Sequence, residues 1–396
     1  MKTDCLYSVT GGVRHYPWGQ STANGDTPFI PAFLGLPAGE EPWAELWLGV
    51  HPSLPSTVTD GEGVSISLAD AIAGNPAAWL GKAAAEKAPG GTLPYLLKIL
   101  SCSHPLSIQS HPDAETAQRL HAEHPELYPD ANDKTEIIIA LSVFQALSGL
   151  RPACEIRKSL ASHPSLSRLS AAMNGDDADG LRSLCAALFA MSAEEAAEML
   201  SQLQEEIAVS SEPSSEDLLF ITLLAEYPGD RGAVFAYLLN CVTLKPGEAL
   251  FLEPNTLHAY MNGTGIECMS NSDNVIRAGL TGKAVDVPTL LATVDFSRSG
   301  AGECVPQELA EGVIRYAPAT PKFRLATYMG QEIRLSEAGD TFAMAVILQG
   351  EAAVSTPGGE FTVKGGDILA RPAAAVSGSI RPLSENTIII WADTAY

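Results

Sequence analysis

The sequence predicts a mainly β fold with a helical lobe, and three observations lead to that prediction. Short strand-like segments broken by Gly and Pro fill residues 1–60, further strand patterns lie within residues 93–111 and 134–149, and strand patterns resume near residue 235. Between them, residues 151–234 have apolar side chains at helical spacing, which predicts an inserted α-helical domain. After residue 315, short strands alternate with Gly-rich turns. We therefore expect a discontinuous β domain of residues 1–150 and 235–315, and a C-terminal β domain of residues 316–396.

The composition is that of a packed protein with an acidic surface. The chain has 396 residues, of which 46% are apolar and 18% charged, unlike a disordered chain. It has 24 Lys and Arg against 47 Asp and Glu, so the net charge is 24 − 47 = −23. Such a surface repels phosphate backbones and anionic lipid. We therefore expect no nucleic acid and no membrane as partners.

The cysteines and the apolar runs indicate a cytoplasmic protein. Seven cysteines are scattered without a CxxC pair, which is typical of reduced thiols. The first residues lack the apolar stretch of a signal peptide. The longest apolar-rich run, residues 137–150, is shorter than the ~20 residues that a membrane span needs.

Several helices can be placed by their first residues. Residues 65–81 are predicted to form one helix with Ser67 as its N-cap, and a second helix is predicted to start at Asp113. In the helical lobe, Ser192 and Glu195 have the spacing of a capping box. The Leu and Ala stripes of this lobe indicate a hydrophobic core, and we assign no chemistry to them.

Strands predicted around residue 100 bring polar side chains together. Residues 93–101 are apolar enough for a buried strand. The segment after it alternates, so Ser107, Gln109 and His111 fall on one face. Residues 134–149 then return to a strand pattern, which places Lys134 and Glu136 on one face of a strand.

Two stretches of the β sequence resemble a motif of cupin barrels. Gly247 leads to Pro254 with one residue more than the motif has, and His258 with Asn262 matches its H-x3-N end. The range Gly366–Pro372 fits the motif's G-x5-P, but Ala and Val stand where a His would follow. The resemblance implies two cupin-like (jelly-roll) β-barrels, of which the C-terminal one has no metal ligands.

Four side chains form a candidate metal site. Gln109 and His111 can point the same way from one strand, and Glu136 shares a face of the next strand with Lys134. His258 follows a Pro-Asn turn that can hold its ring. Two His, one Glu and one Gln suit Zn²⁺ and tolerate Mn²⁺ or Co²⁺. Spacing alone leaves other histidines open as ligands: His51, His104, His121, His124 and His163.

Seven blocks of the chain resemble the type I phosphomannose isomerase family, a family of zinc enzymes with cupin-type barrels and a helical domain. The SIQSHPD and SDNVIRAGLT segments together are the most specific. The matching blocks are YPWG, AELWLGVHP, LPYLLKIL, LSIQSHPD, NDKTE, EPNTLHAY and NSDNVIRAGLTGK.

The resemblance implies a ligand set and a catalytic residue. It implies one zinc ion per chain, and a catalytic role for Arg277. One departure is Gly282, where the family usually has Pro; it loosens the loop that carries Lys283. The implied zinc ligands are Gln109, His111, Glu136 and His258.

The activity that the resemblance implies is the interconversion of mannose 6-phosphate and fructose 6-phosphate through a cis-enediol. The partner is then a phosphosugar, and we expect a monomer. The reaction belongs to mannose metabolism, and it can serve either mannose use or GDP-mannose synthesis.

This chemistry needs a proton-transfer group, charge stabilisation and a phosphate clamp. Lys134 is the first candidate for proton transfer, although a Lys paired with a carboxylate at the cavity rim is the competing interpretation. Asp273 is a second candidate, and Arg277 would stabilise developing negative charge. Glu267 and His51 are candidates for assisting the proton shuttle or ring opening. The phosphate candidates are Ser107, Lys98 and Lys283.

Two other classes of protein remain as alternatives. A non-catalytic sugar-binding or regulatory cupin would keep the barrels but would not need Lys134, Asp273 and Arg277 beside four ligands. An Fe²⁺-dependent cupin dioxygenase prefers two or three His with a carboxylate, and a Gln ligand fits it poorly.

Overall fold

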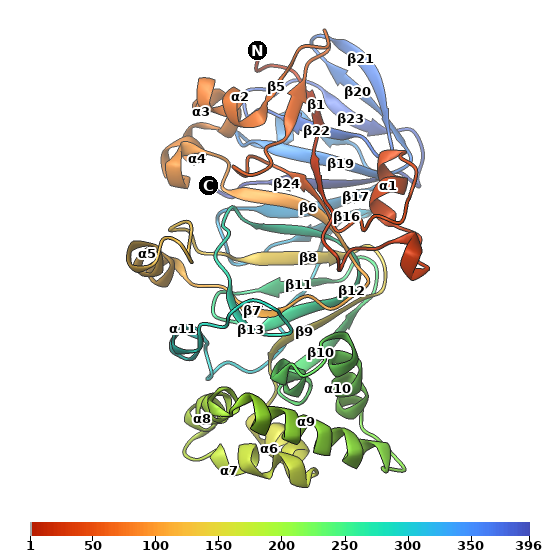
Figure 1. Ribbon diagram of the computed structural model, residues 1–396. Coiled ribbons are helices and arrows are strands. Elements are labelled where there is room, and N and C mark those ends of the chain that lie inside the picture. The colour runs from red at the N-terminus through yellow and green to blue at the C-terminus, as the bar shows by residue number, and fades with distance from the viewer. Residues whose placement is uncertain (1) are drawn as a thin grey trace.

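A computed structural model describes residues 2–396, without the side chains of Pro89 and Glu303. The elements lie in layers (Figure 1), with the nine-stranded and four-stranded sheets at the top, the eleven-stranded sheet in the middle and a helical lobe at the bottom. The predicted mainly β fold with a helical lobe is confirmed. The sheets are antiparallel, and the division into domains stays a prediction.

The eleven-stranded sheet contains all the strands that hold the predicted site. Its longest strand, β12, is shared by two parts of the sheet, which we call its two wings. The first half of β12 pairs with β7 and β9, and the second half pairs with β6 and β8. The strands are β2 (Gly12–Arg14), β3 (Glu45–Leu48), β6 (Tyr95–Cys102), β7 (Ile108–Ser110), β8 (Glu136–Ala140), β9 (Phe144–Leu150), β10 (Leu239–Leu244), β11 (Ala249–Leu252), β12 (His258–Ser270), β13 (Ile276–Gly279) and β14 (Glu303–Cys304).

Each wing has one apolar face that packs on a neighbouring layer. In β8 and β12, Ile137 and Ile266 lie in a core cluster shared with the nine-stranded sheet. Side chains alternate along a strand, so Glu136 and Glu267 face the other way. The apolar packing of this wing thus fixes the direction of two buried carboxylates.

The second wing packs on the helical lobe in the same manner. Ile108 of β7 and Ile276 of β13 lie in the core cluster of the lobe. Gln109 and Arg277, the next residues along each strand, therefore face away from the lobe. The inner faces of the two wings together line the candidate site.

The nine-stranded sheet joins strands from both ends of the chain. Strand β1 near the N-terminus pairs with β22 near the C-terminus. Apolar side chains fill the space between this sheet and the four-stranded sheet. The nine strands are β1 (Tyr7–Thr10), β4 (Thr57–Thr59), β5 (Ser65–Ser67), β15 (Gln307–Ala310), β16 (Val313–Tyr316), β17 (Arg324–Met329), β19 (Ala343–Gln349), β22 (Ile368–Arg371) and β24 (Ile388–Asp393). The four-stranded sheet contains β18 (Ile333–Arg334), β20 (Glu351–Thr356), β21 (Gly359–Lys364) and β23 (Ser379–Pro382).

The helical lobe is built from the predicted stretch. The capping box of Ser192 and Glu195 is present at the start of α9, and Ser214 with Asp217 forms another in α10. The helices of the lobe are α6 (Ala153–Ala161), α7 (Ser167–Ala172), α8 (Asp177–Ala190), α9 (Ala193–Ala208) and α10 (Ser215–Glu226), with the 3₁₀ helices η3 (Pro164–Leu166) and η4 (Arg231–Tyr237).

The prediction of one helix over residues 65–81 is wrong. Residues 65–67 form β5, and two helices follow, separated at Asn75. Pro76 has no N–H for a continuous helix, and Asn75 instead caps the second helix through Ala78 N. Ser67 does cap the first helix, as predicted. The remaining helices are α1 (Phe29–Leu34), α2 (Leu68–Gly74), α3 (Pro76–Leu80), α4 (Lys82–Lys87), α5 (Ala114–Glu123) and α11 (Val287–Thr293), with η1 (Thr22–Asn24), η2 (Pro89–Gly91) and η5 (Leu335–Glu337).

Within residues 2–396, every helix is too short or too polar to span a lipid bilayer.

Candidate metal centre

Strand β12 curls so that its two ends approach one site. Eleven residues separate His258 from Met269, which would place them roughly 36 Å apart on a straight strand. Glu136 pairs with Met269, yet its Oε2 lies 3.5 Å from His258 Nε2. A register shift between residues 260 and 262 and the positive φ of Gly263 (122°) allow the bend. Because β12 bends in this way, His258 and Met269, near its two ends, both lie next to the same site.

Three predicted ligands meet at this centre. His111 Nε2 lies 3.2 Å from Glu136 Oε1, and the rings of His111 and His258 are 4.9 Å apart. All three side chains are buried. Among the described residues, they form the single group of His, Cys, Asp or Glu side chains whose ligand atoms could hold one metal, all within 4.8 Å of one another.

Backbone carbonyls fix both imidazoles in the same tautomer. His111 Nδ1 lies 2.9 Å from Asn274 O, and His258 Nδ1 lies 2.9 Å from Thr256 O. Each Nδ1–H therefore donates to a carbonyl, and each Nε2 has its lone pair toward Glu136. The side-chain amide of Asn274 in turn donates to Asp130 O at 2.7 Å, which holds its loop in place.

The local charges keep Glu136 ionised and His111 neutral. Burial opposes the charge of Glu136, but Lys134 and the two histidines hold its pKa well below the usual range. Burial and the charge of Lys134 lower the pKa of His111 to about 4. An ionised carboxylate and neutral imidazoles are the forms that bind zinc.

The geometry of the group fits a zinc ion. Tetrahedral bonds of about 2.0–2.1 Å place ligand atoms about 3.3 Å apart. His111 Nε2 lies 3.2 Å from Glu136 Oε1 and His258 Nε2 lies 3.5 Å from Glu136 Oε2, so each imidazole is close to that spacing from one of the two carboxylate oxygens. Glu136 Oε2 and His258 Nε2 are buried and have no hydrogen-bond partner within the described chain. Two such atoms directed at one point are expected where a cation binds.

Gln109 has the backbone position of a further ligand. It lies directly opposite His258 of β12 on one side and Arg277 of β13 on the other. Residues paired in this way share a face of the sheet, so the half-buried Gln109 side chain is directed to the site. Its ligation of the metal stays a prediction.

Lys134 lies against the ligands. Its Nζ is 2.8 Å from Glu136 Oε1 and 3.3 Å from His111 Nε2, and the side chain is buried. The turn before it is fixed by the C-terminal part of the chain, where Lys322 Nζ contacts Asp133 Oδ1 at 2.5 Å. Lys134 thus has an ion-pair partner, but that partner is a candidate metal ligand and is itself buried.

Lys98 is enclosed by carboxylates. Its Nζ lies 2.9 Å from Glu267 Oε2 and 3.3 Å from Glu45 Oε1, and 5.3 Å from the centre of the Trp47 ring. Burial works against the charge, but the two carboxylates raise the pKa of Lys98 above its ordinary value. Burial raises the pKa of Glu267. A cation already balanced in this way is a poor phosphate ligand, so these surroundings favour a structural role for Lys98.

His51 and Asp273 form a pair at the rim. His51 Nε2 lies 3.1 Å from Asp273 Oδ2, and the His51 ring packs edge-on against Trp47 at 4.8 Å. The hydrogen bond with His51 lowers the pKa of Asp273. The His51 side chain is buried and that of Asp273 is 54% exposed, so the pair extends from the interior to the solvent.

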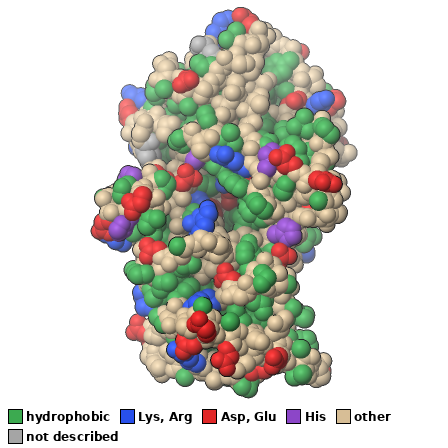
Figure 2. Space-filling model, in the orientation of Figure 1, with side chains coloured by type: hydrophobic (Ala, Val, Ile, Leu, Met, Phe, Trp, Pro, Cys, Tyr) green, Lys and Arg blue, Asp and Glu red, His purple; other side chains and the backbone are tan. Residues whose placement is uncertain are grey.

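Arg277 is half-buried and carries an unbalanced charge. Burial lowers its pKa, and its guanidinium has no hydrogen bond or ion pair with any of residues 2–396. Of the phosphate candidates, Ser107 is half-buried and Lys283 is exposed. Lys, Arg and His side chains are visible in a hollow at the middle of one face, at the height of β6 and β8 (Figure 2).

The competing histidines lie elsewhere or have other partners. His104 contacts Glu226, and His163 contacts Asp217. His121 Nδ1 lies 2.8 Å from Tyr128 O, and His124 is exposed. His51 is the one of the five that borders the site, through Asp273.

Three residues of the site were not predicted. Tyr260 is buried beside Glu267, and its alternation with His258 could have placed it on the inner face. Glu45 could have been found in the same way from Trp47, whose Nε1 donates to Glu45 Oε2 at 2.8 Å. Asn274 has no sequence signal, because its contacts depend on the meeting of two loops.

The fold and the site define a mononuclear metal-binding protein of the mainly β class. A model of the family "Phosphomannose isomerase type I, catalytic domain" matches residues 6–153. The mannose-6-phosphate isomerases of Pan troglodytes and Homo sapiens are each 35% identical over 382 residues, covering 89% of this chain and 89% of the relative. The chain belongs to the type I phosphomannose isomerase family.

A solved structure shows the same architecture. A zinc-bound mannose 6-phosphate isomerase superposes with a TM-score of 0.87 and 29% sequence identity. The alignment covers 99% of this chain and 100% of that chain. The helical lobe and all three sheets are therefore features that this chain shares with that enzyme.

Proposed function

We propose that the protein is a zinc-dependent aldose–ketose isomerase that interconverts mannose 6-phosphate and fructose 6-phosphate through a cis-enediol. One observation carries the proposal: two fixed imidazoles and Glu136 converge beside Lys134. The half-buried Arg277 is paired with Gln109 across the sheet and has no hydrogen-bond or ion-pair partner among residues 2–396. The named relatives and the zinc-bound neighbour support the reaction and the metal.

The metal would be held by His111, Glu136 and His258, with Gln109 as the fourth ligand. Bound there, zinc would supply Lewis acidity that polarises the sugar carbonyl. One ion per chain follows from one ligand group. The inner faces of the two wings exclude water from this centre, which strengthens every charge interaction within it.

We assign proton transfer between C1 and C2 of the sugar to Lys134. Its amine lies at the ligands, where the reacting carbons of a bound sugar would come within reach. Arg277 stabilises the negative charge that develops on the enediolate oxygens, because its donors have no protein acceptor to satisfy. The two residues lie on different wings of the sheet and would contact the sugar from two sides.

The rim residues handle protons that exchange with solvent. The His51–Asp273 pair joins the centre to water and is suited to opening the sugar ring. Glu267 keeps a proton more readily than an ordinary Glu and can pass it to neighbouring buried polar side chains. Both roles are proposals that the geometry permits.

The phosphate dianion would bind to groups that have unused donors. Ser107 precedes β7 on the same face as Gln109, and Lys283 follows the strand of Arg277. Lys98, by contrast, already has two carboxylates around it. We therefore place the phosphate with Ser107 and Lys283 and regard Lys98 as a support for Glu267.

A coupled assay tests the function. Zinc-loaded protein is mixed with mannose 6-phosphate, and fructose 6-phosphate is followed with and without a chelator. We expect turnover that the chelator removes and zinc restores. A zinc-loaded protein that binds the sugar without converting it would be the sugar-binding cupin, and oxygen uptake with Fe²⁺ would indicate the dioxygenase.

We also propose that the protein is a cytoplasmic monomer with the domain division expected from its sequence. The seven free cysteines support a reducing compartment. Light scattering of the zinc-loaded protein would test the oligomeric state, and a dimer mass would contradict it.

A further inference from the structure

The strand that carries Arg277 is attached to the sheet on one side only. Strand β13 pairs with β7, and among the described strands it has no other neighbour. The pairing is interrupted by a register shift between Arg277 and Gly279. A four-residue strand with an interrupted ladder is weakly held, so something else must set its position.

The helical lobe supplies the second attachment, through two glycines. A Cβ on Gly279 would lie 2.6 Å from Gly232 Cα, and a Cβ on Gly232 would lie 2.7 Å from Leu280 N. The backbones of β13 and η4 therefore touch, because neither glycine has a side chain. The lobe thus reaches the residue two positions after Arg277.

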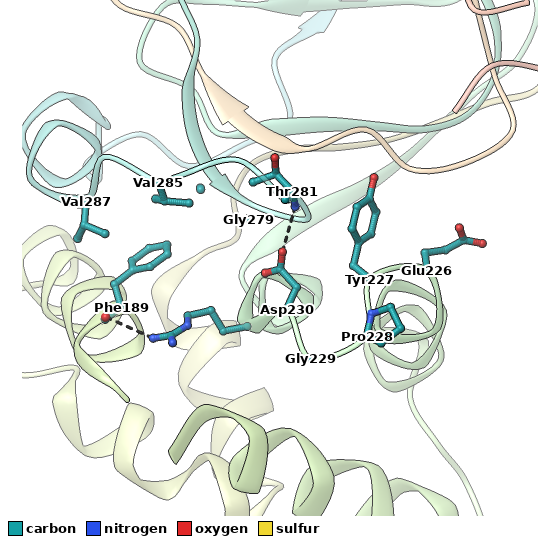
Figure 3. A pocket seen from close by; sticks show the side chains of 13 residues that line it. Phe189, Glu226, Tyr227, Pro228, Gly229, Asp230, Gly279, Thr281, Val285 and Val287 are labelled. Carbon is teal, nitrogen blue, oxygen red and sulfur yellow. Dashed lines mark hydrogen bonds between the residues drawn. The ribbon is translucent and has the colours of Figure 1, made fainter. Parts of the chain in front are cut away.

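A single carboxylate then ties the two backbones together. Asp230 Oδ1 accepts a hydrogen bond from Gly232 N at 2.7 Å, and its Oδ2 accepts one from Thr281 N at 3.0 Å. Figure 3 shows the Asp230 side chain directed at Thr281, with this bond drawn. Leu280, which lies between Gly279 and Thr281, is held at φ 52°, a backbone conformation that a Leu rarely adopts.

The loop beyond this tie has little beneath it. A cavity of about 610 Å³ lies between the lobe and the loop, with Phe189, Tyr227 and Val285 among its walls (Figure 3). A Cβ on Gly282 would meet no atom within 4 Å. Leu280 is buried in the core cluster of the lobe, and the Asp230 carboxylate adds the hydrogen bond that fixes the backbone of Thr281, at the start of the segment leading to Lys283.

We propose that Asp230 is a positioning residue, through which the helical lobe holds Arg277 and the loop of Lys283 toward the metal centre. Arg277 has no side-chain partner in the described chain, so its direction depends on its backbone. The inference rests on the proposed function, because it gives Arg277 a task in the reaction. It also gives the lobe a role, since residues 151–234 contribute no ligand to the centre.

The test compares Asp230→Ala with a matched control. Asp176→Ala removes a similar cap in the same lobe, where Asp176 Oδ1 accepts from Asp179 N at 2.9 Å, but has no contact with β13. We expect Asp230→Ala to lower kcat/KM about 10- to 100-fold and to weaken inhibition by inorganic phosphate, with zinc content unchanged. Asp176→Ala should stay within about 2-fold, and Asp230→Asn should fall between because it keeps one acceptor.

A double-mutant cycle identifies the path. If Asp230 acts through Arg277, Asp230→Ala costs little further activity in an Arg277→Ala background. Hydrogen exchange of residues 276–283 gives a readout that needs no activity, and it should accelerate in Asp230→Ala alone. Unchanged exchange, or an additive cycle, overturns the proposal. A zinc-loaded wild type without isomerase activity would refute the proposed function instead, and faster exchange would still establish the tie.

Discussion

Lys134 Nζ lies 2.8 Å from Glu136 Oε1, so the proposed proton carrier contacts a proposed metal ligand directly. The two residues are neighbours on one face, two positions apart in the sequence. The contact places the positive charge of the amine beside the ligand group. With this contact, Lys134 can be either a structural cation or a group that moves a proton, and its variants distinguish the two roles.

Lys134→Ala should lower kcat by about 10²- to 10⁴-fold, because it removes the proton-transfer group. Zinc should stay near one per chain, since the ligands remain. Turnover is measured with the coupled assay, and zinc by elemental analysis of the dialysed protein.

Lys134→Arg is the matched control for charge. Arginine keeps the positive charge but does not give up its proton readily, so this variant should also be inactive. A normal rate in either variant would show that Lys134 is not the proton carrier. Recovery in Lys134→Arg alone would assign it an electrostatic role.

His258→Ala should lose zinc and activity together. The variant removes one of three converging ligand atoms and leaves Glu136 Oε2 without its neighbour. Losing one of so few protein ligands is expected to weaken zinc binding by orders of magnitude. The measurement is zinc per chain after dialysis against a weak chelator, together with the isomerase rate.

The exposed His124 gives the control, because His124→Ala changes a histidine outside the centre. That variant should keep both zinc and activity. Full zinc occupancy in His258→Ala would remove His258 from the site. The same assay on Gln109→Ala decides whether the amide is a ligand.

Lys322→Ala should slow turnover several-fold and leave zinc bound. Lys322 lies 2.5 Å from Asp133, the residue before Lys134, so its loss loosens the turn that places the amine. The steady-state kcat is measured beside the surface variant Lys364→Ala, which should behave as wild type. Asp133→Asn should have the same effect, and the double variant no more than either. Additive effects would mean that the ion pair does not act on the turn.

The sequence predicts well which neighbouring residues share a face of a strand, but it predicts poorly which distant segments come into contact. Alternation is a property of neighbouring residues, so Gln109 with His111, and Lys134 with Glu136, could be placed without coordinates. Whether His258 reaches them depends on the curl of β12, which follows from a register shift near residue 260. Nothing in the spacing indicates such a shift, and His258 was selected among eight histidines by its cupin-type H-x3-N motif and by the family resemblance.

Lys98 shows why the role of a charged side chain is hard to predict from the sequence. Its residue type suggested a phosphate ligand, which stays a prediction, and the sequence does not show its partner Glu45, which lies 53 positions away. A cation's role depends on what already balances it, and that is set by strand order. The tie between Asp230 and Thr281 was unpredictable for the same reason.

Asp217 should make the helical lobe sensitive to acid. It accepts hydrogen bonds from Tyr237 OH at 2.7 Å and from Ser214 N at 2.8 Å, and His163 Nε2 lies 3.0 Å away. Burial alone would raise its pKa, but these contacts hold the pKa of Asp217 below the ordinary value of 3.8. A carboxyl with a lowered pKa stabilises the folded state above its unfolded pKa, and that stability is lost as the pH falls through the folded pKa.

Asp217→Asn should therefore cost about 1–3 kcal/mol of unfolding free energy near neutral pH, where the wild-type carboxylate is charged. Below about pH 4 the wild type loses this advantage, so the two urea midpoints should converge. The exposed Asp179→Asn, on α8 of the same lobe, is the control and should follow the wild type. Midpoints that stay parallel from pH 7 to pH 3 would show that Asp217 contributes no charge-dependent stability to the lobe.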